Sequence, residues 1–288
     1  MMTPLDLVNL TPLMERTRGD EIAIGLIDGP VAMGHPDLAD ARIREIPGRL
    51  AGTCAQASSA ACQHGTFVAG ILSAKRGSSA PAICPGATLW LRPIFAETAS
   101  GNEMPSARPE ELAQAIVDCL EAGARILNLS AALAEPSTGG QRELEGALDR
   151  AVRRGVIVVA AAGNQGTLGS SVITRHPWVI PVAACDLGGR PVGSSNLGQS
   201  IGRRGLRAPG DDVTSSGAGG TPITLGGTSA AAPFVTGTIA LLWSEFPAAP
   251  AATVRAAVVH AHGPRRTTVV PPLLDAWAAY HVMNRFGG

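Results

Sequence analysis

The sequence contains 288 residues, of which 45% are hydrophobic and 16% charged, and its formal net charge is zero. This length allows a large buried core in one or two domains. Because no tract rich in lysine or arginine stands out, the composition does not favour a nucleic-acid partner or a polybasic membrane contact. No stretch approaches the roughly 18 uninterrupted apolar residues of a membrane span. We therefore expect no nucleic-acid partner and no membrane partner.

The N-terminal extension, residues 1–20, lacks the basic start and apolar core of a signal peptide. For this reason we expect a cytoplasmic protein. The leucines of the extension suit a short amphipathic helix, which we interpret as a packing element.

Five nearly continuous apolar runs predict strands that are buried on both faces, because their residues do not alternate between apolar and polar. The predicted strands are 21–28, 87–95, 124–130, 155–163 and 178–184.

Helical patterns lie between the predicted strands. Residues 108–123 begin with acidic side chains and end in glycine, as helix termini prefer, and residues 140–155 end in arginines and glycine. The alternation predicts an α/β chain with a mostly parallel central sheet flanked by helices. We expect one domain over residues 1–288, with a C-terminal helical segment at 263–288.

The five cysteines are scattered along the chain and odd in number: Cys54, Cys62, Cys84, Cys119 and Cys185. Since none forms a C-x-x-C pair, the cysteines do not suggest a zinc site. We expect no metal site and no cofactor. Without a secretion signal, mostly reduced thiols are expected, although Cys54 and Cys62 are close enough in sequence to leave a bridge open.

Polar residues stand where predicted strands end, which is where parallel sheets display functional groups. Asp28 ends the first strand, and Asn164 follows the fourth. Taken singly, Asp28 is a turn residue, His64 and Ser229 are helix-start residues, and Asn164 is a loop residue.

Taken together, the four residues fill the roles of acyl-transfer catalysis. A serine hydroxyl needs a base to accept its proton, and imidazole suits that task. A carboxylate orients and stabilises the imidazolium, and an asparagine amide with a backbone N–H can bind an oxyanion. The set Asp28, His64, Asn164 and Ser229 therefore points to nucleophilic catalysis.

The order Asp, His, Ser and the flanking motifs resemble the subtilisins, family S8 of the serine proteases. The similar segments are "HGTFVAG", "NLS", "VVAAAGNQG", "LRAPGDDV", which we interpret as the turn before the serine, and "GTSAAAPFVTG". The resemblance implies a three-layer subtilisin-like fold and a serine endopeptidase. It also implies that Asp28, His64 and Ser229 are the triad, and that Asn164 joins the Ser229 N–H in the oxyanion hole.

The resemblance further implies that an extended peptide pairs with the enzyme backbone, as an added β-strand would. The residues assigned to this substrate contact are Ser130, Ala131, Ala132, Gly163 and, on the opposite side, Gly101, Asn102 and Glu103.

The sequence also departs from the subtilisin pattern. Phe67 stands where most subtilisins have a second histidine, Ala131-Ala132 replaces Leu-Gly, and Gly-Pro follows Asp28. No acidic calcium-binding loop is evident at 70–82.

Only twenty-seven residues precede Asp28, too few for a folded pro-domain, so we expect restricted specificity. The segments "LIDGPV", "CQHGTFVAGIL" and "LRPIF" most resemble intracellular subtilisin-like proteases of the cyanobactin-maturation type. That resemblance implies a peptide or precursor-peptide substrate, from which a leader is removed.

Two other classes compete with the endopeptidase interpretation. One is a catalytically silent subtilisin-like module that binds peptides, which the presence of all four catalytic residues disfavours. The other is a nucleotide-binding α/β enzyme, but no G-x-G-x-x-G loop follows the first strand.

The segment "SAAAPFVTGTIALLW" is small and apolar on nearly every face, which predicts a buried helix from Ser229 to about Trp243. We expect Gly226 and Gly227 to form a tight turn before it and Pro233 to fall in its first turns.

Overall fold

The computed structural model describes residues 2–97, 107–130, 140–261 and 268–286. Its centre is a seven-stranded sheet in the order β2-β3-β1-β4-β5-β6-β7. All six neighbouring pairs are parallel. The strands are β1 (Ala23–Asp28), β2 (Arg42–Glu45), β3 (Thr88–Pro93), β4 (Ile126–Leu129), β5 (Ile157–Ala161), β6 (Ile180–Cys185) and β7 (Leu206–Pro209).

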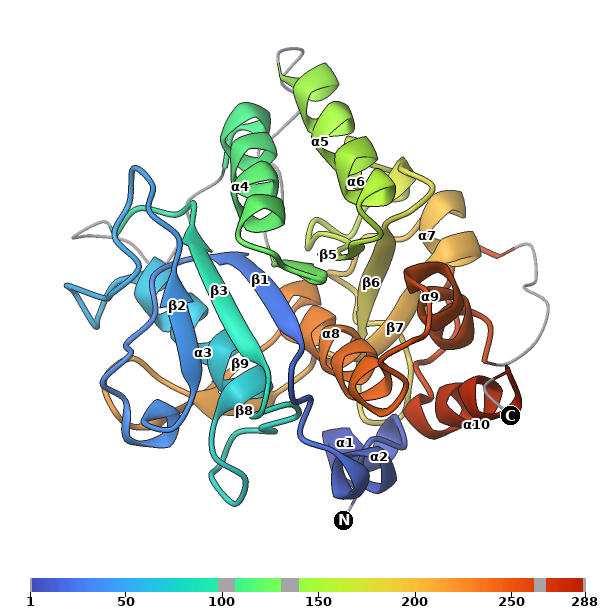
Figure 1. The fold of residues 1–288 in the computed structure, drawn as a ribbon, viewed down its shortest axis with the longest axis horizontal. Coiled ribbons are helices and arrows are strands. Elements are labelled where there is room, and N and C mark those ends of the chain that lie inside the picture. The colour runs from blue at the N-terminus through green and yellow to red at the C-terminus, as the bar shows by residue number, and fades with distance from the viewer. Residues whose placement is uncertain (1, 98–106, 131–139, 262–267, 287–288) are drawn as a thin grey trace.

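An antiparallel hairpin and a set of helices complete the described chain (Figure 1). The hairpin pairs β8 (Val213–Ser216) with β9 (Pro222–Leu225). The helices are α1 (Pro4–Leu7), α2 (Thr11–Arg16), the 3-10 turn Pro36–Leu38, α3 (Ala60–Ser73), α4 (Pro109–Glu121), α5 (Gln141–Arg153), α6 (Val172–Arg175), α7 (Gln199–Arg204), α8 (Thr228–Glu245), α9 (Ala251–Val259) and α10 (Ala276–Phe286).

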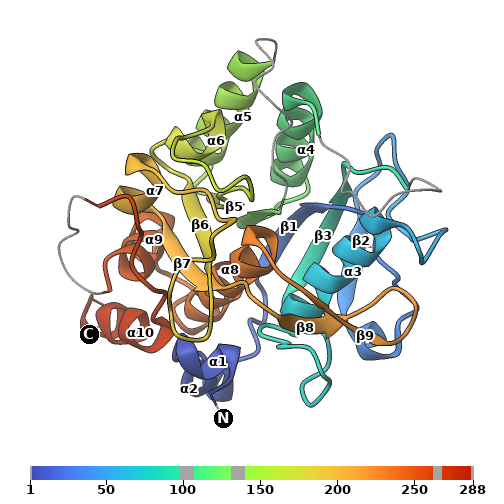
Figure 2. The ribbon, with the colours of Figure 1, turned by 180° about the vertical axis from the view of Figure 1, so that it is seen from behind.

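The sheet separates two apolar cores, so the predicted three-layer α/β architecture is confirmed. On one face, Ile24 and Leu26 of β1 belong to the core formed with α3 and α8. On the other face, Ile27 belongs to the core formed with α4 and α5. Figure 1 shows α4 and α5 at the top of the molecule, and Figure 2 shows α8 and α3 from behind. Strands covered on both faces explain why their sequences are continuously apolar.

Helix α8 lies at the centre of the molecule, as its sequence predicts. Every residue from Thr228 to Trp243 is buried, and the helix packs against four strands, β4 to β7. Pro233 is the sixth residue of α8 and falls within its first two turns, as expected, but not at a position where a missing N–H costs least. With Gly227 as N-cap, Pro233 is inside the helix, beyond the first turn, where a missing N–H removes a helical hydrogen bond.

Two strands at the edges of the sheet were not expected. The segment "LRAPGDDV" was interpreted as a turn, but its first four residues form β7, which pairs with β6. Strand β2 contains three charged residues, and Ile43 is its single partly buried apolar side chain. Strand β2 is mostly exposed, and the four-residue β7 is interrupted by Arg207, so neither has the apolar run that identifies the central strands.

The two ends of the chain pack together beside α8 (Figure 1). The extension 1–20 forms α1 and α2. Helix α2 contacts α8 and α10, and the N–H of Ala276 donates to the carbonyl of Val8. The C-terminal segment is helical over 276–286, while 263–267 lie outside the described residues. Along the part of the chain that the structure describes, no helix is both long and apolar enough to cross a membrane.

The cysteines are in two chemical states. Cys54 and Cys62 form a disulfide, which is the alternative that the sequence left open. Cys84, Cys119 and Cys185 are buried free thiols, as expected.

Candidate active site

Strand β1 and helix α3 bring Asp28 and His64 into direct contact. The His64 Nδ1 atom donates to Asp28 Oδ1 over 2.6 Å, and Asp28 Oδ1 also accepts from the N–H of Gly29 over 2.7 Å. Because a carboxylate oxygen can only accept, the ring carries its proton on Nδ1 when neutral. Its Nε2 atom is then the basic nitrogen, as a general base requires.

Close backbone packing holds this pair in place. A Cβ atom on Gly29 would collide with the carbonyl of Ala61, and a Cβ atom on Gly65 would collide with the carbonyls of Gly29 and Pro30. The missing side chains allow the chain after β1 to lie directly against the first turns of α3. The hydroxyl of Thr66 adds a hydrogen bond by accepting from the N–H of Ala32.

The environment of His64 shifts its basicity. Burial of the ring lowers the pKa of His64, whereas the charge of Asp28 and the hydrogen bond to it raise this pKa, and the net shift is upward. Protonated His64 therefore stabilises the folded state. This stabilisation is complete at pH values below the ordinary pKa of about 6.5, and it is lost as the pH rises through the higher pKa of the folded state.

Ser229 is the second residue of α8 and is buried, with 9% of the residue exposed. Helix α8 packs against α3, which carries His64. Among the described residues the structure records no hydrogen bond between His64 and Ser229. Contacts of this kind often tighten only when substrate binds.

The first turn of α8 leaves one N–H group for a ligand. The N–H of Thr228 donates to Asn164 Oδ1, and the N–H groups of Ala230 and Ala231 donate to the carbonyl of Gly227. The N–H of Ser229 has no acceptor within the described part of the chain. A helix N-terminus with a free N–H favours a bound anion.

Thr228 orients the Asn164 side chain. Its hydroxyl accepts from the N–H of Gly163 over 3.1 Å and donates to Asn164 Oδ1 over 3.0 Å. With Oδ1 bound to both the hydroxyl and the N–H of Thr228, the Nδ2 group of the exposed Asn164 remains available as a donor. Gly227, at φ +108°, is required here, because a Cβ atom would lie 2.9 Å from that Nδ2 atom.

Among the expected substrate-contact residues, Ser130 and Gly163 are described. Ser130 follows β4, is 5% exposed, and accepts a hydrogen bond from Asn128 Nδ2. The Asn128 Oδ1 atom in turn accepts from the hydroxyl of Thr236 in α8, so α8 fixes the end of β4. Gly163 has a φ of +105°, and its carbonyl accepts from Asn196.

The remaining substrate-contact residues lie outside the described part of the chain. They are Gly101, Asn102, Glu103, Ala131 and Ala132.

Phe67 is 1% exposed and belongs to the core beside α8. Its side chain therefore packs in the interior, and it does not line the site.

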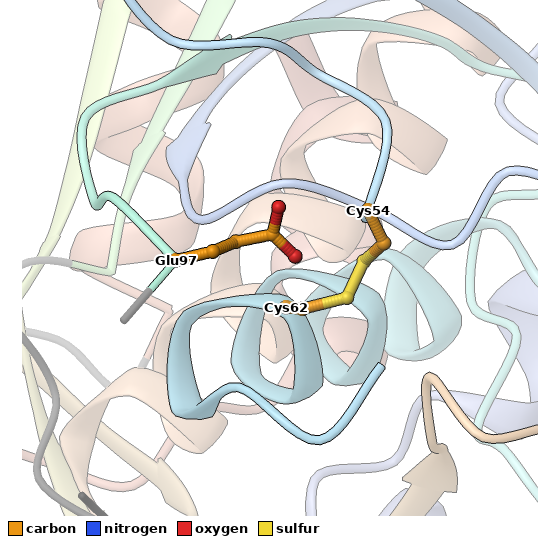
Figure 3. A group of neighbouring side chains, drawn as sticks. All are labelled: Cys54, Cys62 and Glu97. Carbon is orange, nitrogen blue, oxygen red and sulfur yellow. A yellow bond between two sulfur atoms is a disulfide. The ribbon is translucent and has the colours of Figure 1, made fainter. Parts of the chain in front are cut away.

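Among the residues described, one group has the composition of a metal site: Cys54, Cys62 and Glu97, whose ligand atoms lie within 4.8 Å of one another (Figure 3). The two sulfurs are bonded to each other, so neither is a thiolate ligand in this state.

The fold is that of the subtilisin-like serine proteases, and comparisons with known proteins agree. The subtilase family model, peptidase S8, matches residues 19–286. The thermostable alkaline protease of Halalkalibacterium halodurans is 32% identical over 235 residues, which cover 80% of this chain and 58% of that protein. Subtilisin DY of Bacillus licheniformis is 30% identical over 243 residues, covering 83% and 82%.

Two solved structures are similar over nearly their whole length. A serine-to-alanine mutant of the protease domain of PatA has a TM-score of 0.83 and 29% identity, covering 93% of this chain and 98% of that chain. The prenylagaramide maturation protease PagA has a TM-score of 0.81 and 28% identity, covering 95% and 98%. The chain belongs to the subtilase family of serine endopeptidases, although it spans little more than half the length of the alkaline protease.

Two features of the site were missed from the sequence. Thr228 stood inside the quoted serine motif, but its three hydrogen bonds to the Gly163–Asn164 turn were not inferred. Gln63 precedes His64, and its side chain bridges the carbonyl of Ala57 and the N–H of Ala218. Because these partners lie far apart in sequence or in a different element, no local pattern could identify them.

The Asp28→Asn variant tests the electrostatics of the pair. We expect the pKa of His64 to fall below its ordinary value, because burial remains while the raising charge is lost. NMR titration of the imidazole ring measures this pKa, and circular dichroism confirms folding. An unchanged pKa would show that Asp28 does not control this histidine.

Proposed function

We propose that this chain cleaves a peptide bond through an acyl-enzyme, with Ser229 as nucleophile, His64 as general base and acid, and Asp28 as the partner that orients the imidazole. The observation that carries the proposal is the buried 2.6 Å hydrogen bond between His64 Nδ1 and Asp28 Oδ1. It fixes the tautomer in which Nε2 can accept the serine proton.

In the first step, His64 Nε2 takes the proton from Ser229 Oγ as the oxygen attacks the scissile carbonyl carbon. The imidazolium that forms is stabilised by the Asp28 carboxylate and then donates its proton to the leaving amine. In the second step, water attacks the acyl carbon as His64 Nε2 takes its proton. The imidazolium returns this proton to Ser229 Oγ, and the acyl group leaves as a carboxylic acid. The upward shift of the His64 pKa makes Nε2 a stronger base and so assists acceptance of the Ser229 proton.

The oxyanion of the tetrahedral intermediate would be bound by two donors, the free N–H of Ser229 and the Nδ2 group of Asn164. Both belong to groups that the fold orients before substrate arrives, since Thr228 holds the Asn164 amide and Gly227 leaves room for it. Donors that need no reorganisation act most strongly on the transition state.

We further propose a restricted specificity directed at a ribosomally made precursor peptide. Two solved structures support this specificity, those of the prenylagaramide maturation protease PagA and the patellamide maturation protease PatA. Both are similar to this chain over nearly its whole length. An extended peptide would pair with the backbone at Ser130, where α8 holds the end of β4.

A silent peptide-binding module is the second candidate, because no hydrogen bond between His64 and Ser229 is recorded among the described residues. An activated-serine probe separates the two candidates, since a serine without a functioning base reacts poorly with it.

Replacement of the nucleophile gives the first test. We expect Ser229→Ala to abolish fluorophosphonate labelling and to lower kcat by a factor of about a million, since triad members act as a unit. Ser244→Ala is the matched control, because Ser244 is a half-buried serine at the other end of the same helix. Labelling that persists in Ser229→Ala would overturn the nucleophile assignment.

Removal of one oxyanion donor gives the second test. We expect Asn164→Ala to lower kcat by about a hundred- to a thousand-fold with little change in KM, because the oxyanion exists only after attack. This range is the one known for loss of the asparagine donor in subtilisin itself. A raised KM with an intact kcat would instead make Asn164 a residue that binds the ground state.

Mass spectrometry of cleavage products tests the specificity. We expect a peptide library to be cut at a narrow set of sequences and unfolded casein to remain largely intact, with Ser229→Ala protein as the blank. Rapid, dispersed cleavage of casein would show a general protease and would exclude restricted precursor processing.

A further inference from the structure

The Cys54–Cys62 disulfide (Figure 3) links the start of α3, the helix that carries His64, to a loop that is hydrogen-bonded to the chain leaving β1. On one side, the N–H of Cys54 donates to the carbonyl of Val31, and Val31 forms a bridge with Thr53. Val31 follows Asp28 by three residues. Cys54 is therefore fixed to the chain that leaves β1.

On the other side, the disulfide is attached to the first turn of α3. Cys62 is the third residue of this helix and precedes His64 by two residues. The intervening Gln63 accepts from the N–H of Ala218, in the turn between β8 and β9, and donates to the carbonyl of Ala57 within the disulfide loop. That hairpin leads directly into α8 and Ser229.

The disulfide loop, residues 54–62, and the adjoining Gln63 thus contact the segments that supply all three members of the proposed triad. We propose that Cys54 and Cys62 form a thiol–disulfide switch, in which the oxidised pair holds His64 against Asp28 and reduction lowers turnover. This inference rests on the proposed function, since it concerns the same site.

The chemistry requires a thiol reductant, and the two sulfurs differ in access. Cys54 is partly exposed, whereas Cys62 is fully buried, so a reductant thiolate attacks Cys54 Sγ. The S–S bond breaks and Cys62 leaves as a thiolate. A second reductant thiolate then attacks the reductant sulfur of the mixed disulfide and releases the Cys54 thiolate. Two electrons pass to the protein, the reductant becomes a disulfide, and two protons complete the thiols.

The position of Cys62 favours this direction of attack. A leaving thiolate in the first turn of a helix is stabilised by the helix dipole and by nearby N–H groups. The neighbouring Glu97 carboxylate opposes this effect, but its charge is shared with the N–H groups of Ala55 and Gln56 and with the hydroxyl of Ser59.

Glu97 also makes the switch reversible. Its hydrogen bonds hold the disulfide loop at the start of α3 independently of the S–S bond. Because these bonds end at Ser59, reduction frees the first turn of α3 to shift while the two thiols remain within reach of each other, so an oxidant can close the same bridge. These donors and the positive end of α3 also disfavour a cation at the carboxylate, which is why we assign a redox role and not a metal site to this group.

The test is a redox titration of the whole protein in dithiothreitol buffers of graded ratio, with a metal chelator present. We expect kcat for a peptide substrate and the fluorophosphonate labelling rate to fall by about tenfold to a hundredfold on reduction, as small displacements of a catalytic group do. KM should change little, and reoxidation should restore kcat. The midpoint of the loss should coincide with the midpoint of Cys54–Cys62 reduction, measured by alkylation and mass spectrometry.

Two variants control the titration. Cys54→Ala/Cys62→Ala should have the turnover of the reduced protein in every buffer, while Cys84→Ala, which removes a buried thiol outside the loop, should keep the full response. Thermal unfolding of the oxidised and reduced forms confirms that both are folded at the assay temperature.

Three results would overturn the switch. The first is equal turnover of the oxidised and the reduced protein. The second is a loss of turnover on reduction that persists in Cys54→Ala/Cys62→Ala. The third is a loss that appears only without chelator, because it would mean that the freed thiols act by binding a metal. Absence of labelling in the oxidised protein is a different result, since it would refute the proposed function itself.

Discussion

Contact between two backbones, the chain leaving β1 and the first turns of α3, is the constraint on which the site depends. Gly29 and Gly65 have no Cβ atoms, and the carbonyls that face them occupy that space. This packing sets the separation of Asp28 and His64, and the 2.6 Å hydrogen bond follows from it. A side chain at either glycine would separate the two elements, and the carboxylate could no longer reach the ring.

The second half of the site is organised by α8, which serves both the core and the chemistry. The body of the helix is buried against four strands. Two hydroxyl groups of the helix position residues of the site. The hydroxyl of Thr236 fixes the Asn128 side chain near the end of β4, and the hydroxyl of Thr228 orients Asn164. A central helix of small residues therefore places the proposed nucleophile, the proposed oxyanion donors and the expected substrate strand in one rigid unit.

Much of this organisation could be predicted from sequence, for a physical reason. The five central strands and α8 are covered on all sides, so burial forces long apolar runs that a reader can recognise. The polar edge strand β2 is mostly exposed, and β7 is buried but has only four residues, one of them Arg207, so neither leaves such a signal. Asp28, His64, Asn164 and Ser229 could be singled out because their neighbours form motifs similar to those of subtilisins.

Interactions between distant segments could not be predicted in this way. The sequence placed Cys54 and Cys62 near each other, but it could not decide between thiols and a bridge, because nothing local reports the distance between two side chains. The hydrogen bonds of Gln63 and Thr228 depend likewise on contacts made by the folded chain. The cytoplasmic location stays a prediction.

Pro233 has a consequence for the nucleophile. In an α-helix the N–H of residue 233 would donate to the carbonyl of Ser229, and proline has no N–H to donate. The N–H of Ser229, in turn, lies too early in α8 to have a helical acceptor. The carbonyl of Ser229 therefore lacks its regular helical donor and the N–H of Ser229 lacks a helical acceptor, so that N–H can bind a substrate oxygen while the rest of α8 keeps its hydrogen bonds.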